Sequence, residues 1–439
     1  MKRRYPRTIT HLAVVSRFVA RRWMRRAMFV IGGLAVGAAA VLMAMAADRA
    51  QLGFGLIVAR WHFAPLLLTP AGFALCAVLA RGVFPNSAGS GIPQVIAALR
   101  LRGNPARARL VSPWVGVGKV VVMTLGLACG GSIGREGPTV QVGAAIMHAI
   151  GRISPYRQPG FLLAGAAAGV AAAFNTPLAG IVFGIEELGR SFEARTSGLI
   201  IGAVIAAGLT ALAVQGDYSY FGSTPARLPF GRGWLAMVIC AAICGLAGGL
   251  FIRLLVAVAR GLPGAVGRAV GRHPILFAAG CGLVVALCGA VSDGAVFGTG
   301  YAQARAILDG GPMNPWFGPL KFIATVASSI SGIPGGVFSP SLAVGAGLAG
   351  TLAPFLPAAP QGALVLIGMA AFLTGVVQAP ITAFVIVLEM TNDHAMVIPL
   401  MATALIANAA SKLLSREGLY LVLSENYVTQ VLGASQPAR

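Results

Sequence analysis

A glycine-rich break in an apolar part of the chain carries the residues with the clearest chemistry. This first break, residues 130–138, holds Arg135 and Glu136 side by side between long apolar runs. A carboxylate at membrane depth costs roughly 2.5 to 3.5 kcal/mol on insertion scales, so it is usually kept for a polar pathway. Glycines let the backbone open here, and irregular backbone within a membrane is tolerated only where protein or a water-filled cavity covers it.

The segment after the first break is expected to be a helix. Residues 139–147 have a helical pattern, and Pro138 suits the first turn because an N–H has no partner there in any case. Amides at helix N-termini bind anions. The pattern therefore predicts an anion pathway, with Glu136 as a carboxylate that competes with the anion. The neighbours predicted to line this site are Gly134, Arg135 and Gly137. For Arg135 an ion pair is the alternative that we favour.

The composition places the whole chain in a membrane. Its 439 residues are 57% hydrophobic and only 10% charged, and the mean hydropathy is +0.82. Apolar runs recur along it, some near the roughly 20 residues that span a bilayer and others cut by Gly or Pro, as in transporters. We therefore predict an all-α polytopic membrane protein with broken helices, surrounded by the lipid bilayer. The net charge of +21 is spread between the apolar runs, so no nucleic-acid partner is expected.

The basic residues also predict the topology. Arginines cluster before the first apolar run, and the positive-inside rule places both chain ends in the cytoplasm. The polar, turn-rich stretch in the middle of the chain is expected to be extracellular. The expected units are a basic cytoplasmic N-terminal segment 1–26, a first membrane half 27–214, an extracellular loop 215–233, a second membrane half 234–425 and a short cytoplasmic tail 426–439.

The second half of the chain repeats the first at a nearly constant offset. Gly134 recurs as Gly336, 202 positions further on, and Glu186 recurs as Glu389 after a register shift of one residue. A match that extends over such a length argues for duplication. In membrane proteins built from two repeats, the substrate site lies where the repeats meet.

The counterpart of the first break differs from it in its side chains. This second break, residues 332–340, has Val337 and Phe338 where the first break has Arg135 and Glu136. It therefore offers backbone N–H groups without a competing carboxylate. The two breaks could converge on one anion from opposite sides.

A third glycine-rich stretch, Gly-Ser-Gly-Ile-Pro at 89–93, interrupts an earlier apolar region. Its hydroxyl and free amides could coordinate an anion. Gly, Ser and Pro are also the usual residues of an ordinary turn, so the pattern alone leaves both interpretations open.

The remaining reactive side chains give no sign of an enzyme, a metal or a cofactor. The six cysteines lie in apolar runs without metal-ligand or disulfide spacing, and the five histidines are scattered. No nucleophile paired with a base is recognisable, so catalysis is not expected. Lys119 and its repeat counterpart Lys321 lie in apolar runs, where they could raise the potential for anions or have a structural role.

Four motifs in order resemble those of the ClC family of chloride channels and proton/chloride exchangers, in its compact bacterial type. They are Gly-Ser-Gly-Ile-Pro at 89–93, Gly-Arg-Glu-Gly-Pro at 134–138, Gly-Val-Phe-Ser-Pro at 336–340 and Tyr420, with Phe-Asn-Thr-Pro-Leu-Ala-Gly at 174–180 between them. The resemblance extends over about residues 27 to 425. It implies an all-helical inverted repeat of two homologous halves, a homodimer with one pathway in each subunit, and a place in the bacterial inner membrane.

By position, the resemblance assigns roles to individual residues. The chloride-binding residues that it implies are Ser90, Gly91, Ile92, Val337, Phe338 and Tyr420. Ser90 and Tyr420 would donate hydroxyl groups to the central chloride. The backbone amides of Val337 and Phe338 would complete that site. Glu136 would be the outer gate, which occupies an anion site when ionised and moves out when protonated.

Two adjacent glutamates bear on whether the chain exchanges ions or conducts them passively. Glu186 has the counterpart Glu389, so a structural role is expected for it, and Glu389 is expected to pair with a basic residue. Glu187 faces Met390 in the repeat and has no acidic counterpart. In exchangers that the chain resembles, the second glutamate is the inner proton acceptor. The sequence therefore favours an H⁺/Cl⁻ antiporter with Glu136 and Glu187 as its proton stations.

Two alternatives to this hypothesis stay open. One is a passive voltage- or proton-gated chloride channel with the same anion site, in which Glu136 only gates. The other concerns Glu187, which could be a solvated carboxylate at a helix end, where ion pairs contribute little.

Overall fold

The computed structural model describes residues 7–152, 158–189, 194–216, 220–222 and 226–433. Every regular element among these residues is a helix. Eight helices in the described part of the chain are long and apolar enough to cross a membrane, and shorter apolar helices lie among them. The predicted all-α polytopic architecture with broken helices is therefore confirmed.

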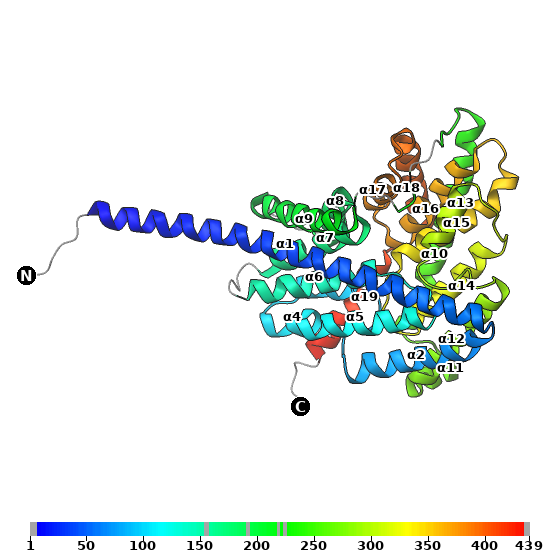
Figure 1. Cartoon of the computed structure of the whole chain (residues 1–439), viewed down its shortest axis with the longest axis horizontal. Coiled ribbons are helices and arrows are strands. Elements are labelled where there is room, and N and C mark those ends of the chain that lie inside the picture. The colour runs from blue at the N-terminus through cyan, green and yellow to red at the C-terminus, as the bar shows by residue number, and fades with distance from the viewer. Residues whose placement is uncertain (1–6, 153–157, 190–193, 217–219, 223–225, 434–439) are drawn as a thin grey trace, which may run out of the picture.

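The first half of the chain forms α1 to α9. Helix α1, Arg7–Arg60, is much longer than the first apolar run, and its N-terminal end projects beyond the other helices (Figure 1). The others are α2 (Ala64–Gly82), α3 (Ile92–Arg100), α4 (Asn104–Val111), α5 (Pro113–Ala128), α6 (Glu136–Gly151), α7 (Gln158–Phe174), α8 (Pro177–Phe183) and α9 (Ala194–Gln215). A π-helical turn, Gly184–Leu188, continues α8.

The second half forms α10 to α18, whose order along the chain resembles that of the first half, and α19 follows. These helices are α10 (Arg232–Ala259), α11 (Gly264–Arg272), α12 (Pro274–Val291), α13 (Tyr301–Leu308), α14 (Phe317–Ile330), α15 (Phe338–Leu352), α16 (Gln361–Val377), α17 (Pro380–Thr391), α18 (Val397–Lys412) and α19 (Leu419–Gly433). Short 3-10 turns cover Ala353–Phe355 and His394–Met396. Helix α19 thus extends into the expected tail, of which 434–439 lie outside the described residues.

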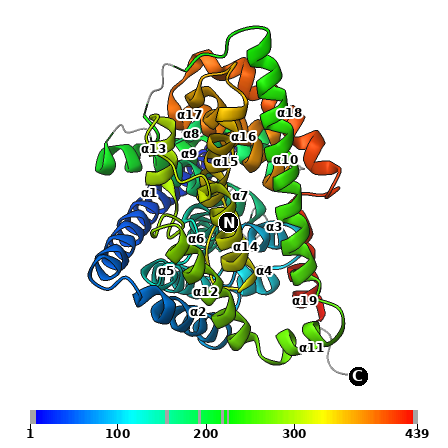
Figure 2. The same cartoon turned by 90° about the vertical axis from the view of Figure 1, so that its right-hand side faces the viewer.

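The repeat is visible in how the helices pack. In the first half α6 packs along α7 and α1 along α9, and in the second half α15 packs along α16 and α10 along α18. Contacts of α2 with α12 and of α8 with α17 join the two halves. Helix α10 runs along one side of the molecule in Figure 2. Two apolar clusters each draw residues from both halves, and the start of α15 lies inside the larger one.

The start of α6 differs from the expectation by three residues. The helix begins at Glu136 rather than at Thr139. The amide of Thr139 donates to the carbonyl of Arg135 at 3.0 Å, which closes the first turn. Pro138 therefore lies within that turn, where its missing N–H leaves no bond unmade. Because of this shift, Glu136 is itself the first residue of the helix.

Candidate functional site

The two breaks of the repeat meet in the centre of the molecule. Gly134 and Gly336 exchange two backbone hydrogen bonds, each of 2.7 Å, as an isolated antiparallel bridge. Each glycine lies just before a helix start, Gly134 before α6 and Gly336 before α15. The bridge therefore holds two helix N-termini next to each other, and each N-terminus presents unbonded amides.

The stretch before α3 reaches the same place. The amide of Gly335 donates to the carbonyl of Gly89 at 3.1 Å. Gly91 has a φ of 103°, and a Cβ there would lie 2.8 Å from the carbonyl oxygen of Gly137. A Cβ on Gly137 would in turn collide with the Ser90 hydroxyl. Only glycine permits these approaches, so the starts of α3, α6 and α15 converge because of the glycines in their breaks.

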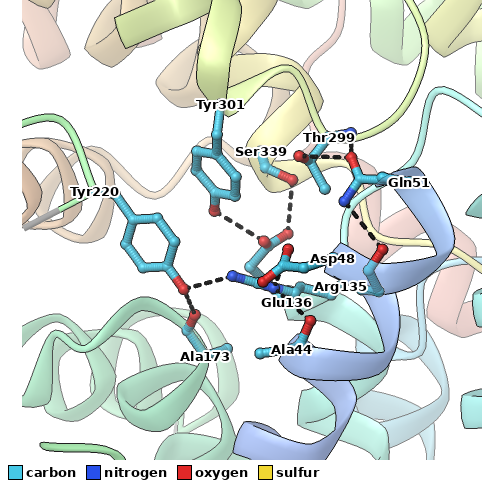
Figure 3. A network of polar contacts seen from close by, with 11 residues as sticks. Ala44, Asp48, Gln51, Arg135, Glu136, Ala173, Tyr220, Thr299, Tyr301 and Ser339 are labelled. Atoms are coloured by element: carbon cyan, nitrogen blue, oxygen red, sulfur yellow. Dashed lines mark hydrogen bonds and ion pairs between the residues drawn. The ribbon is translucent and has the colours of Figure 1, made fainter. Parts of the chain in front are cut away.

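Glu136 lies at this meeting point with its carboxylate fully buried. The hydroxyl of Tyr301 donates to its Oε1 at 2.8 Å, and the hydroxyl of Ser339 donates to its Oε2 at 3.0 Å (Figure 3). Both donors belong to the second half, whereas Glu136 belongs to the first. Neither residue was expected from the sequence, and only the position of Ser339 in the second break gave any signal for it.

Arg135 forms its ion pair with an aspartate of α1 rather than with the neighbouring Glu136. Its Nη1 lies 2.9 Å from Asp48 Oδ1 and 3.0 Å from the carbonyl oxygen of Ala44, both in α1. Its Nη2 donates to the hydroxyl of Tyr220 at 2.8 Å. The Arg135 side chain is 5% exposed and that of Asp48 is 56% exposed. The ion pair that we favoured for Arg135 is confirmed, with a partner that the sequence did not reveal.

Tyr420 is fully buried in the first turn of α19. Its ring stacks on that of Phe338, with the centroids 5.9 Å apart and an angle of 29°. Phe174 and Phe183 meet the Phe338 ring edge-on at 5.7 and 6.0 Å. In the described part of the chain, the buried hydroxyls of Ser90 and Tyr420 have no hydrogen-bond partner. Two such hydroxyls beside helix N-termini can donate to an anion.

The paired lysines hold the backbone in front of two short helices. Lys119 Nζ donates to the carbonyls of Ala88 and Gly89, at 3.2 and 2.9 Å, ahead of α3. Lys321 Nζ donates to the carbonyls of Val296 and Gly298, at 2.8 Å each, ahead of α13. Both lysines are fully buried. These contacts give the two lysines a structural role and identify α13 as the counterpart of α3 in the repeat.

Glu186 and Glu389 each cap the start of a helix in the opposite half of the molecule. The carboxylate of Glu389 in α17 accepts from the amides of Leu178 and Ala179 at the start of α8, at 3.1 and 2.8 Å. The carboxylate of Glu186, on the π-helical turn after α8, accepts from the amides of Ile381 and Thr382 at the start of α17, at 3.1 and 2.6 Å.

The structural role expected for Glu186 is therefore confirmed. The prediction that Glu389 pairs with a basic residue was wrong for the described part of the chain, where the unbonded amides at the start of α8 take that place.

Glu187 lies on the π-helical turn that follows α8 and is half-buried. Single π-helical turns are rare and are frequent at functional sites. Glu186 lies on the same turn and caps α17.

Comparisons with known proteins agree with this arrangement. The family described as Voltage gated chloride channel matches residues 72–412. The H(+)/Cl(-) exchange transporter ClcA of Yersinia pseudotuberculosis is 32% identical over 427 residues, with 90% of this chain and 85% of the relative covered. The protein of that name from Klebsiella pneumoniae is 32% identical over 389 residues, covering 81% and 78%.

Solved structures share the fold. A slow cyanobacterial Cl⁻/H⁺ antiporter superposes with a TM-score of 0.80 at 24% identity, with 92% of this chain and 98% of that chain covered. A CLC-type fluoride/proton antiporter superposes with a TM-score of 0.76 at 20% identity, covering 91% and 97%. The predicted inverted repeat of two homologous halves is thereby confirmed. The chain belongs to the ClC family of chloride channels and transporters.

Proposed function

We propose that this chain is a secondary active transporter that exchanges chloride for protons. The observation that carries the proposal is the buried carboxylate of Glu136 as the first residue of α6, beside a second helix start that has no carboxylate. The relatives named as H(+)/Cl(-) exchange transporters support the chemistry. A transporter of this kind performs no covalent step and is not an enzyme.

Chloride binds where the helix starts converge. A single helix terminus contributes about 0.3 to 2 kcal/mol, so several must act together to replace the water around one ion. The amides of Val337 and Phe338 and the hydroxyls of Ser90 and Tyr420 are the donors for the central chloride, with Gly91 and Ile92 beside Ser90. All of these donors are uncharged. Binding therefore stays weak enough for release, as transport requires.

Glu136 is the outer gate and the outer proton station. Its ionised carboxylate occupies an anion position between Gly134 and Gly137 and excludes chloride from it. Protonation removes the charge, and the side chain moves out while chloride enters. Each opening therefore takes up a proton from one side, and this links proton movement to chloride movement. Arg135 lines the outer side of this position and is held there by Asp48.

Glu187 is the inner proton station. It has no acidic counterpart in the repeat, and it lies on the π-helical turn beside α8. This residue favours exchange over the second candidate function, a passive channel gated by Glu136. A passive channel needs only one carboxylate in the pathway, whereas an exchanger needs a route for protons that differs from the chloride route.

A second copy of the chain is the proposed partner. Helices α8 and α17 are too short to span a bilayer, and they meet across the two halves. Leu178 and Ile381 on these helices are 53% and 51% exposed. A protein surface is a better cover than lipid for helix ends at this depth. We propose that this homodimer lies in the bacterial inner membrane with both chain ends in the cytoplasm.

Proton movement in liposomes tests the function. Purified protein is reconstituted with a chloride gradient, no initial pH gradient and a clamped membrane voltage. We expect chloride to drive protons uphill. Glu187→Gln is expected to stop proton movement while chloride still passes, because an amide cannot carry a proton. The exposed Glu425→Gln is the matched control and is expected to stay coupled. Chloride flux without proton flow in the unmodified protein would make it a channel.

A further inference from the structure

Tyr301 is the first residue of α13 and contacts Glu136 from the opposite half of the molecule. The preceding residue, Gly300, has a left-handed conformation with a φ of 84°, and a Cβ there would lie 3.0 Å from Lys321 Cε. Lys321 also binds the carbonyls of Val296 and Gly298 in the same loop. A buried lysine therefore fixes the start of α13, and this fixes the position from which the Tyr301 hydroxyl contacts Glu136.

A second tyrosine braces the ring of Tyr301. Tyr220 stacks on it with the ring centroids 4.7 Å apart and an angle of 23°. The Tyr220 hydroxyl accepts from Arg135 and donates to the carbonyl of Ala173 at 3.0 Å (Figure 3). The residue that precedes Glu136 thus holds Tyr220, and Tyr220 holds the ring that binds Glu136. The carboxylate and its donor are positioned by one network.

The two hydroxyl donors hold the Glu136 side chain in place. A carboxylate accepts two hydrogen bonds, one on each oxygen, from Tyr301 and Ser339. Hydrogen bonds to a charged acceptor are roughly twice as strong as those between neutral groups. A protonated carboxyl group has less acceptor strength and needs an acceptor for its own proton. Protonation therefore weakens the hold on the side chain at the moment when the gate is to open.

We propose that Tyr301 is a positioning residue that holds ionised Glu136 in the closed position and so sets the pH at which the pathway opens. This inference rests on the proposed role of Glu136 as the outer gate. The direction of the expected pH change follows because Tyr301 binds the ionised form of Glu136. Without the Tyr301 bond the closed, ionised state is less stable, so a smaller proton concentration suffices to open the gate.

Other charged or titratable groups surround the gate. They are Arg135 next to it in the chain, Asp48 from α1, Tyr220 from the loop between the halves and Tyr420 from α19. A change of Tyr301 to phenylalanine leaves all of them in place. It also keeps the ring that stacks on Tyr220, so the fold around the gate is retained.

The test measures chloride flux against external pH in liposomes for the full-length protein and for Tyr301→Phe. We expect the pH of half-maximal flux to move to higher pH by about one unit, which is a tenfold change in the proton concentration needed. Ser339→Ala removes the bond to the other oxygen and is expected to move the curve in the same direction. Thr299→Val is the matched control, because Thr299 lies in the same loop as Gly300 and its hydroxyl donates to Gln51 of α1 and not to Glu136.

A Glu136→Gln background tests whether the effect of Tyr301 depends on the Glu136 carboxylate. Tyr301→Phe is expected to have no effect there, since the bond to a carboxylate no longer exists. Coincident pH curves for Tyr301→Phe and the unmodified protein would overturn the inference. So would an equal shift in Thr299→Val or in the Glu136→Gln background. If the unmodified protein shows no proton coupling and Tyr301→Phe still shifts the curve, the exchange function fails and the inference stands.

Discussion

The starts of α6 and α15 have the same backbone and different side chains. Gly134 and Gly336 take the same place in the bridge, and each lies two residues before its helix. The first helix begins with Glu136 and the second with Phe338, whose ring packs against Tyr420. Duplication therefore supplied two equivalent sets of amides. Under the proposed function, the difference in one side chain at each start separates gating from anion binding.

The largest expected effect comes from making the two starts alike. Glu136→Ala leaves both helices with an uncharged first residue, so we expect proton flux to fall to the level of protein-free liposomes while chloride still passes. Phe338→Ala is the matched change in the second start. It keeps the backbone amide, so coupling is expected to persist while chloride affinity falls several-fold. Coupled transport in Glu136→Ala would remove the difference between the two starts.

Alanine substitutions at the two glycines of the bridge test how much space lies beside each helix start. A Cβ on Gly134 would collide with the Glu136 carboxylate and with Ser339, whereas one on Gly336 would lie 2.9 Å from the amide nitrogen of Gly137. Gly134→Ala is expected to displace the gate and to raise chloride flux at alkaline pH. Gly336→Ala is expected to cost about 1 to 3 kcal/mol of stability by overpacking, without that rise. Chloride flux against pH and thermal melting in detergent distinguish the two effects.

The smallest expected effect concerns a pair in which the repeat kept its symmetry. Glu186→Ala and Glu389→Ala each remove a cap from a helix start, at about 1 kcal/mol. Glu186 also accepts from the Thr382 hydroxyl at 2.8 Å, so its loss is expected to lower the melting temperature slightly more. Both variants keep Glu187, and coupling is expected to persist. The exposed Glu425→Ala is the control, and an equal loss there would show that the caps have no special weight.

The two breaks could be located from the sequence, because glycine and proline act locally and the repeat marks them twice. The contact between Tyr301 and Glu136 could not, since it joins residues 165 positions apart and belongs to no motif. The partner of Glu389 was missed for a related reason. A carboxylate in sequence suggests a cation, but the backbone amides at the start of α8 become visible only once the two halves are packed together.

The bridge between Gly134 and Gly336 also restricts how this molecule can move. Many transporters with two repeats expose their site alternately by rocking one half against the other. Rocking about this centre would break two buried backbone hydrogen bonds of 2.7 Å and leave their groups unpaired. The halves are thus joined at the point where they would have to separate. We expect this chain to complete a transport cycle through rotations of single side chains, without movement of the two halves against each other.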